Sequence, residues 1–320
     1  MEWAMLGMIF LAGIVLIVKG GDWFVDAASW IAEASGIPKL IVGATIVSLA
    51  TTLPELLVSA MAASQGKVDM AVGNAVGSVT ANLGLIMAVS VLCMPVAVRR
   101  GDYLMKSLLM LAGAGILTWG CRQGQVGLGM SLALMAVFAL FTYENLRAAR
   151  RSMRFGGTMG PLCPAQPRRR VVLGQCVKFT AGAVAVVIGA DLLVDSSSAM
   201  ARLAGIPERV IGVTIVAIGT SLPELVTTVT AIAKRQSALS VGNILGANIL
   251  DLTLILPVSA LIARRPLPVS AASAMIDLPA CLLVGVIAVV PAMAFARFRR
   301  WQGMALLAVY GGYLWLTCGA

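Results

Sequence analysis

The chain has 320 residues, of which 59% are hydrophobic and only 12% are charged, and its mean hydropathy is +0.94. Soluble domains are about half apolar and about one quarter charged, so this composition excludes a water-soluble fold. The net charge of +10 comes from basic residues in short segments between apolar runs. Such a pattern argues against nucleic acid as a partner. The composition indicates a polytopic membrane protein whose surroundings are the lipid bilayer.

Ten apolar runs of about 20 residues each predict ten transmembrane helices. In chain order they cover residues 4–32, 38–64, 70–96, 103–120, 125–146, 171–201, 207–233, 238–262, 269–296 and 301–318. The N-terminal MEWAMLGMIF lacks the basic region of a cleavable signal and is expected to begin the first span. A polar stretch rich in Arg, Gly and Pro, 147–170, predicts a flexible linker between two five-helix domains, 1–146 and 171–320.

The basic residues also predict the orientation in the membrane. With the N-terminus outside, about 17 Lys and Arg residues fall in or beside the inner loops and about six in the outer loops. This asymmetry predicts a multi-pass protein of the cell (inner) membrane. Both termini would face the outside or the periplasm, and the linker would be cytoplasmic.

The two halves of the chain repeat each other at a constant offset. Glu55 corresponds to Glu224, and 224 − 55 gives 169; Asp22 and Asp191 keep the same offset. From residue 20 to residue 86, roughly 26 of 67 positions are identical, which indicates an internal duplication. Five spans per copy is an odd number, so the second copy must enter the membrane inverted. Inverted repeats are typical of secondary transporters that bind their ions near the midplane.

Two similar segments lie in the middle of the second and seventh spans, Thr51–Glu55 (TTLPE) and Thr220–Glu224 (TSLPE). Each combines a capping-box pattern with proline, which is how a helix starts, so both spans are predicted to be broken there. A broken helix offers carbonyls, hydroxyls and a carboxylate together. Hard cations prefer such oxygen ligands. The alternative is an ordinary proline kink with threonines bonded to their own helix.

The carboxylates are the strongest sign of function. Placing Glu55 or Glu224 at mid-membrane costs about 2.5 kcal/mol or more without a partner. At equivalent points of inverted repeats the two groups would lie close together and repel each other. A bound cation or a shared proton would remove that repulsion.

The third and eighth spans carry a second set of polar residues. Their glycines, Gly73, Gly77, Gly242 and Gly246, are expected to allow close helix approach. Asn82 and Asp251 lie deep in apolar runs, either on the ion path or in interhelical hydrogen bonds, and Ser78 shares a helix face with Asn82. Two further asparagines, Asn74 and Asn243, fit helix packing or the ion path equally. For Asp22, Asp26, Asp191 and Asp195 interfacial hydrogen bonds are favoured over an access route.

These blocks are GATIVSLATTLPELLVS…VGNAVGSVTANLGL, within 43–86, and GVTIVAIGTSLPELVTT…VGNILGANILDLTL, within 212–255. They resemble the α-1 and α-2 repeats of the sodium/calcium exchanger family, part of the Ca²⁺/cation antiporter superfamily, and the likeness extends over essentially the whole chain. The resemblance implies a prokaryotic-type antiporter, not an enzyme, that exchanges Ca²⁺ for Na⁺ by alternating access. It would have no permanently bound cofactor and would work as a monomer.

The resemblance also implies a set of ion ligands. Glu55 and Glu224 would be central carboxylates shared by both ions, and Thr51 and Thr220 would supply oxygens to Ca²⁺. At the Na⁺ positions it implies the backbone carbonyls near Ser48 and Ala217 and the Ser78 hydroxyl. Asn82 and Asp251 would border the middle position. The hydroxyls of Thr52 and Ser221 in the two motifs are further candidates.

One position departs from the family pattern. Ala247 stands where the family carries serine, so one Na⁺ position loses a ligand. The G-N-x-x-E pattern of proton/calcium exchangers is absent, which argues against that branch. An antiporter of the same fold coupled to H⁺ or another cation stays open as the alternative. An intramembrane acid-dyad enzyme is less favoured because no known protease signature accompanies the acids, and a channel because broken inverted repeats suit occlusion.

Overall fold

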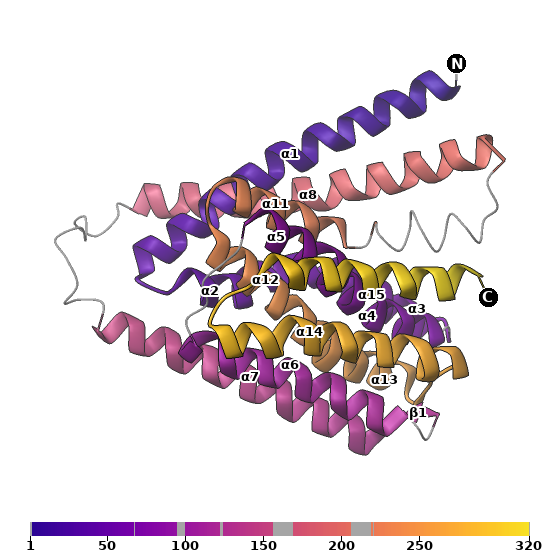
Figure 1. Ribbon diagram of the computed structural model, residues 1–320. Helices are drawn as coiled ribbons and strands as arrows, with labels where there is room; N and C mark the ends of the chain where they lie inside the picture. The colour runs from indigo at the N-terminus through magenta and orange to yellow at the C-terminus, as the bar shows by residue number, and fades with distance from the viewer. Residues whose placement is uncertain are drawn as a thin grey trace. The chain divides into compact units, whose positions relative to one another are not determined.

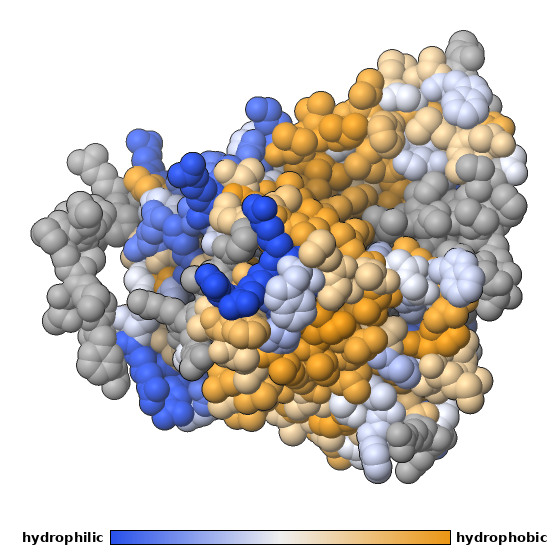
Figure 2. Space-filling view, in the orientation of Figure 1, coloured by the Kyte–Doolittle hydropathy of each residue, from blue (hydrophilic) through white to orange (hydrophobic). Residues whose placement is uncertain are grey.

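A computed structural model describes residues 2–66, 68–94, 100–121, 124–155, 169–205, 219 and 221–319. The described chain is almost entirely helical (Figure 1). Eight of its helical runs are long and apolar enough to cross a membrane. Hydrophobic residues dominate the face of the molecule in Figure 2, as a lipid-facing surface requires. The all-helical membrane fold predicted from composition is therefore confirmed.

The first half contains the helices α1 to α7, two π-helical segments (η1 and η2) and one short strand. Their bounds are α1 (Glu2–Ser35), α2 (Lys39–Val42), η1 (Gly43–Val47), α3 (Ser48–Ser64), α4 (Val68–Ala81), η2 (Asn82–Met87), α5 (Ala88–Cys93), α6 (Arg100–Gly120), β1 (Gln125–Val126) and α7 (Leu128–Phe155).

The second half follows the same plan. Its elements are α8 (Arg169–Leu203), α11 (Leu222–Ala233), α12 (Ser237–Leu250), η6 (Asp251–Ile255), α13 (Leu256–Ala263), β2 (Leu267–Pro268), η7 (Ser273–Asp277), α14 (Leu278–Phe295) and α15 (Arg300–Gly319). Of the predicted seventh span, the structure describes α11 and little before it, because residues 206–218 lie outside the described part.

The helices flanking the predicted linker are longer than expected. Helix α7 continues to Phe155, and α8 begins at Arg169, so both enter the 147–170 stretch. The physical reason lies in the composition of the ends. Arg and Ala, which fill residues 147–151, are good helix formers, whereas the Gly and Pro residues are concentrated between 156 and 167.

The chain forms two compact units, and each draws on both halves of the sequence. The first unit contains residues 1–51 and 144–243, and the second contains residues 52–143 and 244–320. These units do not coincide with the sequence halves 1–146 and 171–320. Helices α3, α7 and α12 each begin in one unit and end in the other.

In the first unit, α1 and α8 pack along a seam of glycines (Figure 1). A Cβ on Gly13 would lie 3.0 Å from the carbonyl oxygen of Gly189, and one on Gly20 would lie 2.9 Å from that of Gly182. The larger residue number on one helix thus faces the smaller number on the other, so the helices are antiparallel. Gly13 and Gly182 are equivalent in the two repeats, as are Gly20 and Gly189. This pair of corresponding helices therefore runs in opposite directions, as inversion of the repeats requires.

In the second unit, aromatic and small side chains provide the fit between helices. A Cβ on Gly84 would lie 2.7 Å from the Tyr310 side chain, and the Tyr103 ring meets Phe298 edge to face at 5.6 Å between centroids. Strands β1 and β2 pair antiparallel, with Gln125 opposite Pro268. This short ribbon joins the start of α7 to the segment that follows α13.

Candidate functional site

Helix α3 carries the first motif carboxylate into the interior. The sequence predicts a helix start at Thr52–Glu55, but α3 runs unbroken from Ser48 to Ser64 with Pro54 inside it. Proline removes one backbone donor, and the rest of the helix tolerates that loss. The second span is instead irregular at the π-helical segment η1, which ends five residues before Thr52. Glu55 is 1% exposed.

At the second motif a helix begins, as the sequence predicts. Helix α11 begins at Leu222 with Ser221 as N-cap residue, Pro223 in the first turn and Glu224 directly after it. Ser221 makes no side-chain cap hydrogen bond, so the capping-box geometry expected from the sequence is absent. Its hydroxyl is buried without a hydrogen-bond partner among the described residues. Glu224 is 1% exposed, as buried as Glu55.

In the first unit a hydrogen-bonded chain joins three helices. The Thr51 hydroxyl lies 3.2 Å from the Asn243 side-chain oxygen and 3.2 Å from the Ser48 carbonyl oxygen. The Asn243 amide donates to the Thr227 hydroxyl at 3.0 Å, and Thr227 donates to the carbonyl of Pro223 at 2.9 Å. Asn243 therefore cross-links the predicted ligand helices. Sequence comparison missed Thr227 because the equivalent residue of the first repeat is Val58.

In the second unit Asn74 forms hydrogen bonds to helix α3. Its amide donates to the Glu55 carbonyl oxygen at 3.2 Å and to the Ser59 hydroxyl at 2.9 Å. Asn74 and Asn243 are equivalent in the repeats, and each is bonded to the helix that carries a motif glutamate. The amide thereby holds that helix in register.

The polar pair Asn82 and Asp251 occupies a special backbone position. Asn82 is the first residue of η2, Asp251 is the first residue of η6, and 251 − 82 again gives 169. Each residue is 1% exposed, and Asn82 Oδ1 has no hydrogen-bond partner in the described part of the chain. Widened π-helical turns occur often at functional sites. The sequence singled out these residues but gave no sign of the π-helical turns.

Two glycines bring the second and eighth spans together in the first unit. A Cβ on Gly43 would lie 2.3 Å from the Leu239 carbonyl oxygen, and one on Gly242 would lie 2.2 Å from that of Leu40. No real Cβ tolerates such distances, so the close-approach role predicted for Gly242 is confirmed. At Gly73 and Gly77 a Cβ would meet no described atom within 4 Å.

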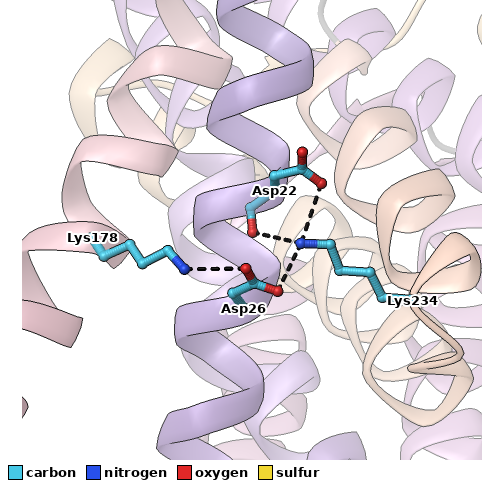
Figure 3. Close-up of polar contacts among 4 residues, drawn as sticks. All are labelled: Asp22, Asp26, Lys178 and Lys234. Carbon is cyan, nitrogen blue, oxygen red and sulfur yellow. Dashed lines mark hydrogen bonds and ion pairs between the residues drawn. The ribbon is translucent and has the colours of Figure 1, made fainter.

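The acids of the first span are engaged in ion pairs (Figure 3). Lys234, directly after α11, pairs with Asp26 at 2.7 Å and with Asp22 at 3.2 Å, and it donates to the Asp22 carbonyl oxygen at 3.0 Å. Lys178 of α8 pairs with the other Asp26 oxygen at 3.1 Å. For Asp22 and Asp26 this agrees with the favoured hydrogen-bonding role. The cluster ties α1 to α8 and α11.

The predicted ligands are thus divided between the two units. The first holds Ser48, Thr51, Ser221, Glu224 and Asn243; the second holds Thr52, Glu55, Asn74, Ser78, Asn82, Ala247 and Asp251. Thr220 and Ala217 lie outside the described residues. Within the described part of the chain, no three acidic, His or Cys side chains gather into a metal cluster. Each unit instead contains one motif glutamate and several buried hydroxyl or amide side chains.

Buried carboxylates among hydroxyl, amide and carbonyl oxygens, in a duplicated all-helical membrane fold, define a transporter of cations. Comparison with known proteins agrees with this class. The family described as "Sodium/calcium exchanger protein" matches residues 5–146 and 175–319. The chain therefore belongs to the sodium/calcium exchanger family and is a cation antiporter, not an enzyme.

Individual relatives are similar over nearly their full length. The Sodium/calcium exchanger MaX1 of Methanosarcina acetivorans is 30% identical, over 96% of this chain and 97% of its own. Inner membrane protein YrbG of Escherichia coli is 33% identical, over 97% and 95% respectively. Among solved structures, the sodium-calcium exchanger NCX_Mj soaked with 10 mM Na⁺ superposes with a TM-score of 0.79 at 28% identity, covering 97% of both chains.

Proposed function

We propose that this protein exchanges Ca²⁺ for Na⁺ across the cell membrane by alternating access. The observation that carries the proposal is the pair of motif glutamates. Glu55 and Glu224 occupy the same repeat position, and each is 1% exposed in an apolar helix. Carboxylate oxygens are the ligands that hard cations prefer, so two buried carboxylates at matched repeat positions in apolar helices suit a transported cation.

The proposed ion ligands are those expected from the family pattern. Glu55 and Glu224 together provide a charge of about −2, which matches one Ca²⁺ ion. Thr51 and Thr220 supply oxygens to Ca²⁺, and Thr52 and Ser221 are further candidate ligands. The carbonyls near Ser48 and Ala217, and the Ser78 hydroxyl, serve Na⁺. Asn82 and Asp251 border the middle position.

Coupling between the two ions follows from their sharing of ligands. Sodium ions must displace Ca²⁺ from the same two glutamates, so the carrier holds one kind of ion at a time. It then exposes the loaded state to alternate sides of the membrane. We further propose that the chain acts as a monomer, with both termini outside or periplasmic and the central linker cytoplasmic.

One observation favours a second candidate, in which protons replace part of the sodium. Ser78 of the first repeat corresponds to Ala247 of the second, which has no hydroxyl to offer an ion and is fully buried. A third buried acid, Asp251, stands where the first repeat has Asn82. A carboxyl can bind and release a proton, whereas the amide side chain of asparagine does not titrate near neutral pH.

Uptake of radiolabelled Ca²⁺ into proteoliposomes tests both candidates. An outward Na⁺ gradient at constant pH should drive uptake, whereas an outward H⁺ gradient without Na⁺ should not. Uptake driven by the H⁺ gradient alone would replace the first candidate with the second. Failure of both gradients to drive uptake would reject Ca²⁺ as the substrate.

Matched substitutions test the glutamates. Glu55→Gln and Glu224→Gln should each abolish gradient-driven uptake, because the remaining single charge cannot balance Ca²⁺. Glu33→Gln is the control, since the Glu33 side chain is 65% exposed and pairs with Lys39 at the end of the first span. It should leave uptake unchanged. Robust uptake by either motif variant would refute the proposed ligand set.

A further inference from the structure

A groove in the second unit has the properties of a binding site and plays no part in the proposed ion exchange. It has a volume of about 550 Å³ and lies between the start of α7 and the end of α13. Leu128, Leu132 and Met135 line it from α7 at a spacing of one helix face. From α13, Pro257 and Leu261 form the opposite wall. The groove is therefore apolar along about two helical turns, or roughly 10 Å.

One end of the groove is cationic. Arg264 and Arg265, which follow α13, line this end, and both side chains are exposed. Arg265 donates to the Gly66 carbonyl oxygen at 3.1 Å, and no described carboxylate pairs with either arginine. The N-terminus of the 28-residue α7 lies at the same end and adds its positive partial charge. An anion would be stabilised here.

The wall of the groove also contains an unsatisfied polar group. Ser131 of α7 lines the groove and is 8% exposed, and its hydroxyl has no hydrogen-bond partner among the described residues. Buried hydroxyls in folded proteins almost always have a partner. The Ser131 hydroxyl is therefore available to bond with a molecule in the groove, at the level where the apolar wall meets the arginines.

The neighbouring surface indicates the depth of this end in the membrane. Trp119, at the end of α6, is 73% exposed and lines an adjoining hollow that shares Gly127 with the groove. Exposed tryptophans gather at the membrane–water interface. The arginines accordingly lie at headgroup level, and the apolar part of the groove extends into the hydrocarbon.

We propose that this groove is a site for one anionic phospholipid of the surrounding bilayer. An acyl chain lies along α7 and α13, the phosphate contacts Arg264 and Arg265, and a glycerol or ester oxygen accepts from Ser131. Guanidinium groups bind phosphate oxygens in a two-pronged geometry, and each basic residue near an anionic headgroup contributes about a factor of five in affinity.

Native mass spectrometry of the full chain with an equimolar mixture of phosphatidylglycerol and phosphatidylcholine tests the proposal. The wild type should retain one phosphatidylglycerol in preference to phosphatidylcholine. In the double variant Arg264→Gln/Arg265→Gln, the ratio of retained phosphatidylglycerol to phosphatidylcholine should fall about thirtyfold. Arg150→Gln/Arg151→Gln, an exposed pair at the other end of α7, is the matched control and should retain it.

A second variant tests the apolar part of the groove without changing the arginines. Ala260→Phe fills the groove from α13 and should weaken retention of both lipids while leaving the arginines in place. Equal retention of phosphatidylglycerol by the wild type and both groove variants would overturn the proposal. Displacement of the lipid by an equal concentration of free glycerol phosphate would assign the arginines to a soluble anion instead. A dimer that dissociates in the Ala260→Phe variant would assign the groove to a second copy of the chain, and it would overturn the proposal equally.

Discussion

Gly242→Ala tests how closely the eighth span must approach the second span for ion binding. An added Cβ would lie 2.2 Å from the Leu40 carbonyl oxygen and 3.1 Å from the Ala44 nitrogen. Ordinary contact needs about 3.4 Å or more, so the two backbones must separate by about 1 Å. The Thr51–Asn243 contact, now 3.2 Å, would then exceed hydrogen-bonding distance. The first-unit network around Glu224 would lose its link to α3.

The repeat supplies a control for this substitution. Gly73 is equivalent to Gly242, but a Cβ there meets no described atom within 4 Å. Alanine raises the helix propensity of both variants by the same amount, about 1 kcal/mol. Overpacking destabilises only Gly242→Ala, by about 1–3 kcal/mol. Gly242→Ala should melt at a lower temperature than Gly73→Ala.

The same pair of variants should differ in transport. A displacement of about 1 Å at a binding site can cost up to about a hundredfold in rate. We therefore expect Ca²⁺ uptake by Gly242→Ala to fall at least tenfold, while Gly73→Ala keeps wild-type uptake. Equal melting temperatures and equal uptake in the two variants would refute the close-approach reasoning.

Three further substitutions test other parts of the structure. Asn243→Leu should lower the unfolding free energy by about 1–3 kcal/mol, measured by thermal melting, because it breaks the contacts to Thr51 and Thr227; an unchanged melting temperature would deny it a cross-linking role. Lys234→Met should lower the unfolding free energy by only about 1 kcal/mol or less, because its ion pairs are partly exposed. High salt should remove the difference in melting temperature from wild type, and a large loss that does not depend on salt would contradict this. Ala247→Ser should lower the Na⁺ concentration that half-saturates exchange, and an identical Na⁺ dependence would show that the missing hydroxyl is not a ligand.

Most of the helical plan is predictable because its causes are local. Runs of about 20 apolar residues must form spans in lipid, where every backbone group needs an internal partner. The repeat offset likewise predicts opposite directions for equivalent helices, and the glycine contacts of α1 with α8 agree with it. The ends of α7 and α8 are not predicted, because a polar stretch rich in Arg, Gly and Pro indicates a linker, although arginine and alanine favour helix.

The site is less predictable from the sequence. Glu55, Glu224 and Asp251 stand out because charge is rare in apolar runs. A π-helical turn has no such signature, since it depends on how one extra residue fits against neighbouring helices. At Pro54 the sequence predicts an interruption that the helix does not have. Its pattern indicates a helix start, yet α3 continues through it because one missing hydrogen bond costs less than ending a packed helix.

The matched π-helical segments η2 and η6 also record how the protein arose. A widened turn behaves as a one-residue insertion in a helix, and two independent insertions would rarely fall at positions 169 residues apart in an ungapped repeat. The simplest history has the insertion present in a single five-helix ancestor before its gene was duplicated. Only afterwards did the residue that opens the turn diverge into Asn82 and Asp251.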